Sequence, residues 1–337
     1  MSIIPVEVPT GAIRYNTDSN KMECFNGTKW MQVSVSSPDL NGGARGIISG
    51  GSSPGASPYA KTDTIQYITI STAGNAIDFG NLLAAKGSTA SCASNTRGLN
   101  SGGTPSAVNT IQYVTIASTG NAIDSGDLTN GRSSHTGFSN ATRGIVAAGG
   151  QDPNNLATID YVTISSLADA KDFGDLTDSK DYLGSYASPT RGIIAGGQTP
   201  TKQNVIEYIT IASTGNGQDF GDLTVKRRFL QGVGNSTRAI FGSGATPSST
   251  NVIDNITMAT KGNATNFGDD IKIRLEGSAA CSSPIRGTWG GGYNSPDGFN
   301  DISYIAIATE GDAIDFGDLL ANNFGASGTS NGHGGLG

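Results

Sequence analysis

The sequence predicts an all-β protein, a closed β-propeller of six blades that follows a short N-terminal β-hairpin segment. One reason is composition: Gly occurs 49 times, interleaved with Ile, Val, Tyr and Thr, while charged residues make up only 15% of the chain. The other reason is an internal repeat, because one unit recurs six times at intervals of 46 to 52 residues. We assign residues 1–40 to an anchoring or assembly segment and residues 41–337 to the propeller.

The repeated unit opens with an arginine, followed by a small residue and an apolar pair. These arginines are Arg45, Arg97, Arg143, Arg191, Arg238 and Arg286. A small pair such as Gly196-Gly197 comes next, and then an apolar segment such as Ile206-Glu-Tyr-Ile-Thr-Ile211. A Gly-Asn or Gly-Asp pair such as Gly215-Asn216 suits a tight hairpin, and an Asp-Phe-Gly-Asp-Leu element ends the unit.

Each unit has room for four short strands, which is the content of one propeller blade. We expect the first strand in a segment of small residues, such as residues 87–94, and the second between the arginine and the Gly pair. The third is the Ile-x-Tyr strand and the fourth contains Asp-Phe-Gly. A β-helix would need much shorter coils, and a helical solenoid would show a 3.6-residue apolar period, which is absent.

The two ends of the repeat region complement each other. Too little repeat-like sequence precedes Arg45 for a first strand, whereas residues 323–330 resemble the missing one. We therefore expect the C-terminal segment to pair with the first unit, close the ring and cover its exposed sheet edge.

Charge and cysteine content limit the partners. A net charge of −7 argues against binding to nucleic acid or an anionic membrane, because both need a basic surface. The three cysteines, Cys24, Cys92 and Cys281, are too few and too far apart for a disulfide framework. The first residues do not resemble a signal peptide, and no apolar stretch approaches the ~20 residues that span a bilayer.

The Gly pairs and the aromatic residues after them resemble the kelch repeat, over residues 41–337. The aromatic residues are Tyr67, Tyr113, Tyr161, Tyr208 and Tyr304, then Phe79, Phe173, Phe220, Phe267 and Phe316. Kelch repeats usually carry Trp at the second aromatic position, so the match is kelch-like. The resemblance implies the propeller fold and leaves the function open, because one fold serves many functions.

The segment Gly11–Trp30 resembles one found in fibre and structural proteins of tailed bacteriophages. It combines Gly-Ala-Ile-Arg-Tyr-Asn, a Thr17–Asn20 turn, and a strand that ends near Trp30. Together with Ser/Thr/Gly/Asn-rich blades, it is similar to structural proteins of marine phages that infect cyanobacteria. The resemblance implies a virion location, synthesis in the host cytoplasm without a signal peptide, contacts with other virion proteins through the N-terminal segment, and a homo-oligomer, a trimer by analogy.

Enzyme chemistry is not indicated. Two histidines, His135 and His333, are too few for the copper site of a kelch-type oxidase. Arginines repeated in every unit suggest a structural role, whereas sialidase-like hydrolases use an arginine cluster at the ring centre. We expect the six arginines to pair with the repeated aspartates of the Asp-Phe-Gly element (Asp78, Asp124, Asp172, Asp219 and Asp315, with Asn266 in the fifth unit). No catalytic, cofactor or metal site is predicted.

Local function is expected where units depart from the repeat. The first unit has a longer connection, residues 52–64, which contains Tyr59, and the sixth carries Trp289, Tyr293 and Phe299. Exposed aromatic rings beside polar loops can stack on a sugar or anchor a protein, although they can equally cap a blade edge. The sequence thus favours a non-enzymatic virion structural protein (tail fibre, head fibre or capsid decoration) that contacts the host surface. A carbohydrate-binding adhesin is the alternative, and a propeller hydrolase is the weakest candidate.

Overall fold

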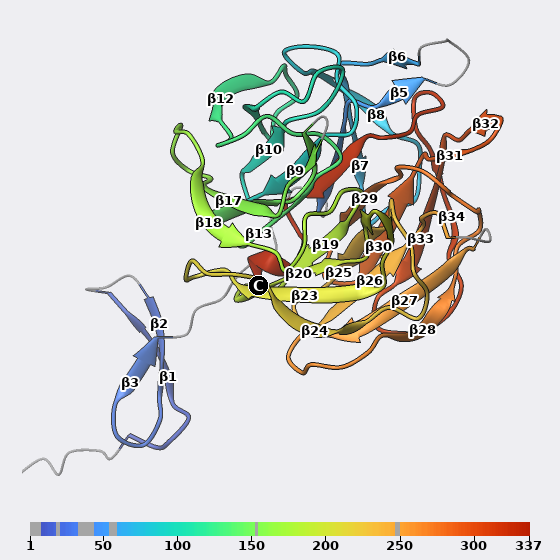
Figure 1. Ribbon diagram of the computed structural model, residues 1–337. Coiled ribbons are helices and arrows are strands. Elements are labelled where there is room, and N and C mark those ends of the chain that lie inside the picture. Colours follow the sequence, from blue (N-terminus) through green and yellow to red (C-terminus); the bar gives the residue numbers. More distant parts are fainter. Residues whose placement is uncertain (1–7, 18–20, 33–43, 54–58, 152–153, 247–249) are drawn as a thin grey trace, which may run out of the picture. The chain divides into compact units, whose positions relative to one another are not determined.

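The computed structural model describes residues 8–17, 21–32, 44–53, 59–151, 154–246 and 250–337. The chain divides into two compact units, Met1–Asn41 and Gly42–Gly337 (Figure 1). Three of the four residues of the predicted Thr17–Asn20 turn, residues 18–20, lie outside these ranges.

The first unit contains a three-stranded antiparallel sheet. Its strands are β1 (Ile13–Asn16), β2 (Lys21–Phe25) and β3 (Trp30–Gln32), in that order. The predicted hairpin is therefore present, with Ile13 opposite Cys24, and a third strand extends it by placing Met31 opposite Cys24.

The second unit contains six four-stranded antiparallel sheets among its described residues. We number them along the chain. The first sheet is β35 (Ser327–Ser330), β4 (Arg45–Ser49), β7 (Thr64–Thr69) and β8 (Ile77–Asn81). The second is β9 (Ala90–Ala93), β10 (Arg97–Ser101), β11 (Thr110–Thr115) and β12 (Ile123–Asp127). The third is β13 (Thr136–Ser139), β14 (Arg143–Ala147), β17 (Thr158–Thr163) and β18 (Lys171–Asp175).

The remaining three sheets repeat the same order. The fourth is β19 (Gly184–Ala187), β20 (Arg191–Ala195), β23 (Val205–Thr210) and β24 (Gln218–Asp222). The fifth is β25 (Gln231–Gly234), β26 (Arg238–Gly242), β27 (Val252–Thr257) and β28 (Thr265–Asp269). The sixth is β29 (Ala279–Ser282), β30 (Arg286–Gly290), β33 (Asp301–Ala306) and β34 (Ile314–Asp318). The four strands predicted for each unit are thus confirmed.

The C-terminal segment completes the first sheet, as predicted. Strand β35 pairs with β4 so that Ser327 lies opposite Ser49 and Ser330 opposite Gly46. The first strands also contact one another in sequence, from β9 through β13, β19, β25 and β29 to β35, and β35 contacts β9. These strands consist mostly of small residues, which allows such close approach.

The apolar core is divided among six clusters, each shared by two consecutive sheets. Ile47 and Phe79 of the first sheet pack with Ile116 of the second, and Ile68 of the first packs with Phe316 of the sixth. Strands that are apolar on both faces fit this arrangement, because each sheet is covered on both sides. The other four clusters lie between the second and third, third and fourth, fourth and fifth, and fifth and sixth sheets.

The Gly-Asn pair does not form the predicted tight hairpin between third and fourth strands. Seven residues separate β7 from β8, and the Gly-Asn pair bonds instead to the fourth strand of the preceding sheet. Gly120 N–H donates to Phe79 O (2.8 Å), and Asn81 N–H donates to the Asn121 side chain (3.0 Å). A Cβ on Gly80, whose φ is +147°, would lie 2.4 Å from Gly120 O, so this contact requires glycine. The Asp-Phe-Gly and Gly-Asn motifs therefore repeat together.

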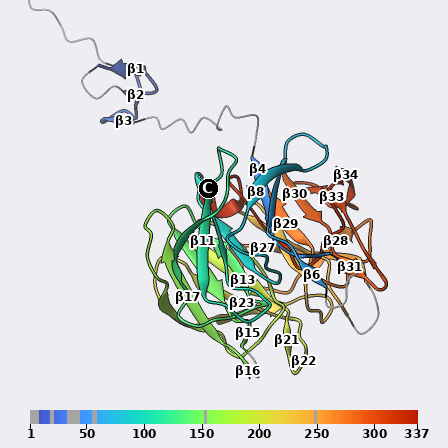
Figure 2. The same cartoon turned by 90° about the horizontal axis from the view of Figure 1, so that it is seen from above.

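Among the described residues, four small hairpins follow second strands. They are β5–β6 (Ser52–Ser53, Ala60–Lys61), β15–β16 (Gly150–Gln151, Asn154–Asn155), β21–β22 (Gln198–Thr199, Thr201–Lys202) and β31–β32 (Tyr293–Asn294, Asp297–Gly298). The one described helical element is a 3₁₀ turn, η1 (Gly334–Leu336), on the side of the sheets opposite to hairpins β15–β16 and β21–β22 (Figure 2). Over the described ranges, the structure contains no helix that is long and apolar enough to cross a membrane.

Candidate functional site

The six repeated arginines do not pair with the Asp-Phe-Gly aspartates, so that prediction is wrong. Each guanidinium donates to a backbone carbonyl that directly follows the third strand of the next sheet, as Arg97 does to Ile164 O (2.9 Å) and Arg191 to Met258 O (2.7 Å). Each also lies over an aromatic ring, for example Arg97 over Tyr113 at 4.3 Å from the ring centroid. The same two roles recur at Arg45, Arg143, Arg238 and Arg286.

The strand register explains the error. Arg45 lies opposite Thr69, whereas Asp78 lies opposite Gln66, three residues further along the same strand. Three residues of strand span roughly 10 Å, and an odd separation points side chains to opposite faces of the sheet, so Arg45 and Asp78 do not meet. The arginines are nonetheless structural, because they join sheets through carbonyls and rings.

Buried ion pairs exist at positions that the sequence analysis missed. Arg132, Lys180 and Arg227, in the connections that lead into the third, fourth and fifth sheets, pair with Asp160, Glu207 and Asp254 of those sheets' third strands. All six side chains are at most 2% exposed. Burial lowers the pKa of Arg227, and Asp254 opposes that shift. The sequence did contain a signal, because a basic residue lies five residues after the Asp-Phe-Gly-Asp element, or its equivalent, in five of the six units, while the sixth has Asn323 there. These residues are Lys86, Arg132, Lys180, Arg227 and Arg274.

Trp289 is not an exposed binding residue. It is fully buried in β30, within the apolar cluster between the fifth and sixth sheets, and its Nε1 donates to Gln231 O (3.2 Å). The inward-facing position of a second strand explains this placement, because its neighbour Gly242 leaves room for the indole. Trp289 is therefore a core residue.

Tyr59 and Tyr293 do come together, with Phe324 as a third ring. Their hydroxyl oxygens are 3.3 Å apart, and Phe324 lies 5.0 Å from Tyr59 and 5.2 Å from Tyr293 between ring centroids. Tyr59 is 44% exposed, whereas Phe324 is buried. The cluster joins hairpins of the first and sixth sheets, so it also seals the contact between the two ends of the repeat region. Phe299 lies apart from these contacts, 5.4 Å from the Lys272 ammonium.

A left-handed backbone conformation recurs at one position just before each first strand. Its six residues all have left-handed φ angles between 51° and 66°: Ser88, Ser134, Tyr182, Phe229, Gly277 and Gly325. Backbone hydrogen bonds link them along the repeats: Ser134 N–H donates to Ser88 O (2.9 Å), and Ser88 N–H donates to Gly325 O (2.7 Å). We call this set the left-handed belt.

Two members of the belt are aromatic, although glycine suits this conformation best. The rings of Tyr182 and Phe229 pack against each other, with centroids 4.1 Å apart and an angle of 46° between the ring planes. The Arg228 guanidinium lies 5.4 Å from the Tyr182 ring and 4.9 Å from the Phe229 ring. Strained residues of this kind tend to occur at functional sites.

The residue before each belt member differs in every repeat. This second set, which we call the variable ring, consists of Gly87, Ser133, Asp181, Arg228, Glu276 and Phe324. Each forms an isolated bridge to the segment after the Gly pair, for example Asp181 to Gln198 and Ser133 to Gly150. The backbone is therefore the same at all six positions while the side chains present different chemistry.

A polar hollow of about 630 Å³ opens beside the belt. One wall is hairpin β15–β16, and the other is the Thr104–Ala107 loop of the second sheet. Ser133, Asp181 and Tyr182 complete its lining. We call this feature the polar hollow.

Asp181 is the charged residue among the described residues that line the polar hollow. Its Oδ1 atom is buried without a hydrogen-bond partner, and the Asn155 side chain bonds to the same carboxyl group. Burial raises the pKa of Asp181 to about 6, against the opposing influence of Arg228.

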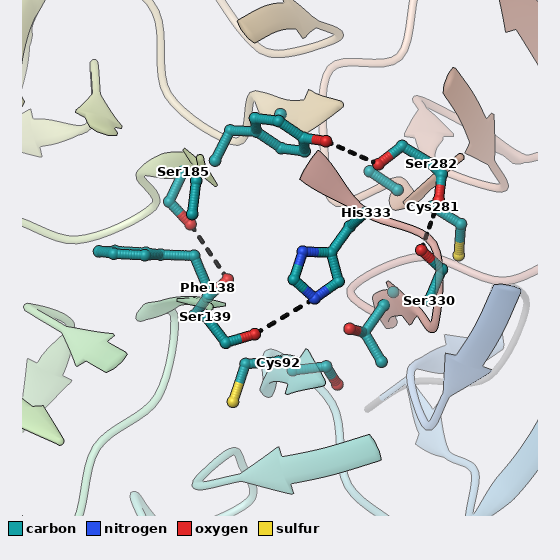
Figure 3. Close-up of a pocket in the computed structure, with 16 residues that line it drawn as sticks. Cys92, Phe138, Ser139, Ser185, Cys281, Ser282, Ser330 and His333 are labelled. Atoms are coloured by element: carbon teal, nitrogen blue, oxygen red, sulfur yellow. Dashed lines mark hydrogen bonds between the residues drawn. The ribbon is translucent and has the colours of Figure 1, made fainter. Parts of the chain in front are cut away.

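A smaller cavity of about 50 Å³ lies at the other end of the first strands. His333, next to η1, points into it among Ser139, Ser185 and Ser330 (Figure 3). Its Nε2 donates to Ala93 O (2.9 Å), and its Nδ1 accepts from Gly335 N–H (3.2 Å), which matches the neutral ring. Burial lowers the pKa of His333 to about 4, so its side chain is uncharged at neutral pH. The C-terminal segment thus places a neutral imidazole in this cavity.

Metal and thiol chemistry are not indicated by the part of the chain that the structure describes. It contains no group of three or more His, Cys, Asp or Glu side chains that could hold a metal ion. Burial raises the pKa of the Cys92 and Cys281 thiols to about 12, so both remain protonated.

The N-terminal sheet has two chemically different faces. Ile13, Tyr15, Met22, Cys24 and Met31 share one face by register, and four of them are exposed, from 44% for Met22 to 64% for Ile13. The other face carries the Arg14–Glu23 ion pair and Trp30, over which Arg14 lies at 4.1 Å. We call the first of these the apolar face.

Comparison with known proteins identifies no relative: no protein-family model matches the chain, and no curated protein matches it in sequence.

Proposed function

We propose that this chain is a non-enzymatic structural protein of a tailed-phage virion, in which the N-terminal sheet holds copies together and the larger unit is the presented module. The observation that carries the proposal is the apolar face on a separate small unit. A three-stranded sheet of this size buries too little apolar surface to be stable alone. An uncharged face of Ile and Met side chains is readily covered by the same face of another copy, without unpaired charges.

The presented module is a closed six-bladed propeller in this proposal. The contacts among the six first strands, from β9 to β35 and back to β9, support it. The apolar cluster and the Gly74 N–H to Phe316 O bond (2.8 Å) between the sixth and first sheets support it as well. Such a module is rigid and has no long exposed sheet edge, which suits a surface protein that must not aggregate.

The virion location rests on the resemblance of Gly11–Trp30 to phage fibre segments. Immunogold labelling of phage particles with an antibody against residues 44–337 tests it, and we expect gold on the particles. Labelling of bacterial surfaces in the absence of phage would replace the virion location with the adhesin alternative.

Self-association is tested on the purified full chain by sedimentation velocity. We expect a homo-oligomer, a trimer by analogy with fibre proteins, that the Ile13→Lys/Met31→Lys variant converts to monomers. The matched control, Gln32→Lys, adds a charge to the same strand on the opposite face and should leave the oligomer intact. A monomeric wild-type chain, or an oligomer that survives both charges, would remove the assembly role of the apolar face.

A second candidate function, glycan binding, is favoured by the polar hollow, whose size lies within the range of small-ligand sites of about 300–1,000 Å³.

A further inference from the structure

We propose that the polar hollow binds one neutral sugar residue of a glycan, with Tyr182 against the apolar side of the sugar ring and Asp181 accepting hydrogen bonds from its hydroxyl groups. The inference goes beyond the assembly role of the N-terminal sheet, and it holds for the isolated chain whether or not the protein is part of a virion. It assigns binding to residues different from Tyr59, Trp289, Tyr293 and Phe299.

The first argument is the unfavourable backbone conformation of Tyr182. Its φ of 57° is a conformation that side chains rarely adopt, and two repeats use glycine at the same belt position. Packing alone does not require an aromatic ring there, because Ser88 and Ser134 serve the same backbone bonds. Tyr182 lines the polar hollow, and its contact with the Phe229 ring holds the Tyr182 ring in place. A fixed aromatic ring beside polar groups is a surface on which the C–H side of a sugar packs well.

The second argument is the acceptor that the fold leaves unused. Asp181 Oδ1 is buried and has no hydrogen-bond partner in the described structure, which is costly unless a ligand or water donates to it. The Asn155 side chain lies beside the same carboxyl group and favours its ionised form, which lowers its pKa against the effect of burial. Paired sugar hydroxyls are donors that a carboxylate can accept in this setting.

The third argument is the rest of the lining. Gln151, Asn154 and Asn155 provide amides that both donate and accept, and Thr104 and Ser106 provide hydroxyls. Sugar hydroxyls also donate and accept, so this set matches them. The volume of the hollow, about 630 Å³, lies within the range of about 300–1,000 Å³ of small-ligand sites.

The charge of the lining selects against acidic sugars. Asp181 is the one charged side chain among the described residues that line the hollow. A uronic acid or sialic acid would bring a second carboxylate close to it, which like-charge repulsion disfavours. We therefore expect neutral hexoses and N-acetylhexosamines to bind and acidic sugars to be rejected.

The test uses the full chain and methyl glycosides of glucose, galactose, mannose and N-acetylglucosamine, with methyl glucuronide as the acidic probe. Binding is detected by saturation-transfer NMR and quantified by calorimetry. We expect at least one neutral glycoside to bind and the glucuronide not to bind. Asp181→Asn and Tyr182→Gly should each weaken binding about tenfold or more, as expected for the loss of a charged acceptor or a stacking ring.

The controls separate binding from folding. Tyr182→Gly places glycine where the backbone favours it, so its melting temperature should stay close to that of the wild type. Glu276→Gln changes the variable ring in another repeat, and Tyr293→Ala removes an aromatic ring elsewhere, so both should bind like the wild type. Should Tyr182→Gly be unstable, Gln151→Ala tests the same hollow from its hairpin wall.

Three results would overturn the proposal. They are a wild-type chain that binds none of the neutral glycosides even at tens of millimolar, equal binding of the glucuronide, or unchanged affinity in folded Asp181→Asn and Tyr182→Gly variants.

Discussion

The six repeated arginines and the six residues of the variable ring occupy equally regular positions, yet they are used in opposite ways. All six arginines donate to carbonyls of other sheets and lie over aromatic rings, so one solution is copied six times. The variable ring has an equally regular backbone but carries Gly87, Ser133, Asp181, Arg228, Glu276 and Phe324. A side chain that is repeated in all six units thus belongs to the framework, by which we mean the contacts that hold the sheets together. A side chain that varies on a fixed backbone belongs to the surface available for recognition.

The strongest test of the framework is removal of residues 321–337, which deletes β35 and η1. The first sheet would lose its inner strand and the contacts of β35 with β9 and β29. We expect a loss of more than about 5 kcal/mol in the free energy of unfolding, comparable to the whole stability of a typical domain. Calorimetry measures it, and deletion of residues 1–41 serves as the control that should leave the larger unit's melting unchanged. A truncated chain that melts like the full one would contradict the framework role of β35.

A buried pair at a repeated position should have the next largest effect. Arg227→Ala leaves Asp254 buried without its partner, and we expect a loss of about 3–5 kcal/mol in denaturant unfolding. The double variant Arg227→Met/Asp254→Leu should recover most of this stability, because no unpaired charge remains. Equal losses in the single and double variants would show that packing, and not charge pairing, determines the effect.

Acid should destabilise the protein through a residue outside the repeat. The pKa of His333 is about 4 in the folded state and about 6.5 when unfolded, so the unfolded state binds more protons between these values. Stability should therefore fall by about 3 kcal/mol as the pH drops from 7 to 4. Urea unfolding at several pH values measures it, and His333→Gln should flatten this slope. An unchanged slope in that variant would assign the acid sensitivity to other groups, including His135, whose pKa burial lowers to about 3.

Single arginines of the repeat should matter moderately and equally. Arg97→Ala and Arg191→Ala each lose one bond to a carbonyl and the close cation–π contact with a tyrosine, and Arg191→Ala also loses a more distant one with Phe220. We expect about 1–2 kcal/mol for each variant. Thermal unfolding of both variants measures the loss. A difference of several kcal/mol between the two variants would show that the repeated arginines do not contribute equally to stability.

The smallest effect is expected in the variable ring, and it should have the opposite sign. The folded pKa of Asp181, about 6, exceeds its unfolded value of about 3.9, so its ionisation costs stability as pH rises through this window. Asp181→Asn should stabilise the protein by no more than about 1 kcal/mol, because the group is partly exposed. The gain in stability should be larger at pH 8 than at pH 4. If Asp181→Asn instead destabilised the protein at pH 8, the Asp181 carboxylate would be needed to stabilise the fold.

Much of the fold was predictable from the sequence because strands and turns are local and were repeated six times. The order of the four strands followed from the positions of Arg191, Ile206 and Phe220, and the pairing of residues 327–330 followed from a missing strand. Assignment of contacts between units was less successful. Trp289 and the arginine partners were predicted wrongly, because adjacency in a motif does not give the register between strands.

By itself, the sequence determined the all-β class, the repeated unit and the strand that the C-terminus supplies. The tertiary structure decided which side chains meet: Tyr59 with Phe324, Arg227 with Asp254, and Asp181 with a hollow built from the second and third sheets. The physical reason is range. Backbone preferences and apolar alternation act over a few residues, whereas a binding surface is assembled from connections that are about 50 residues apart in the chain and adjacent only after the sheets have packed.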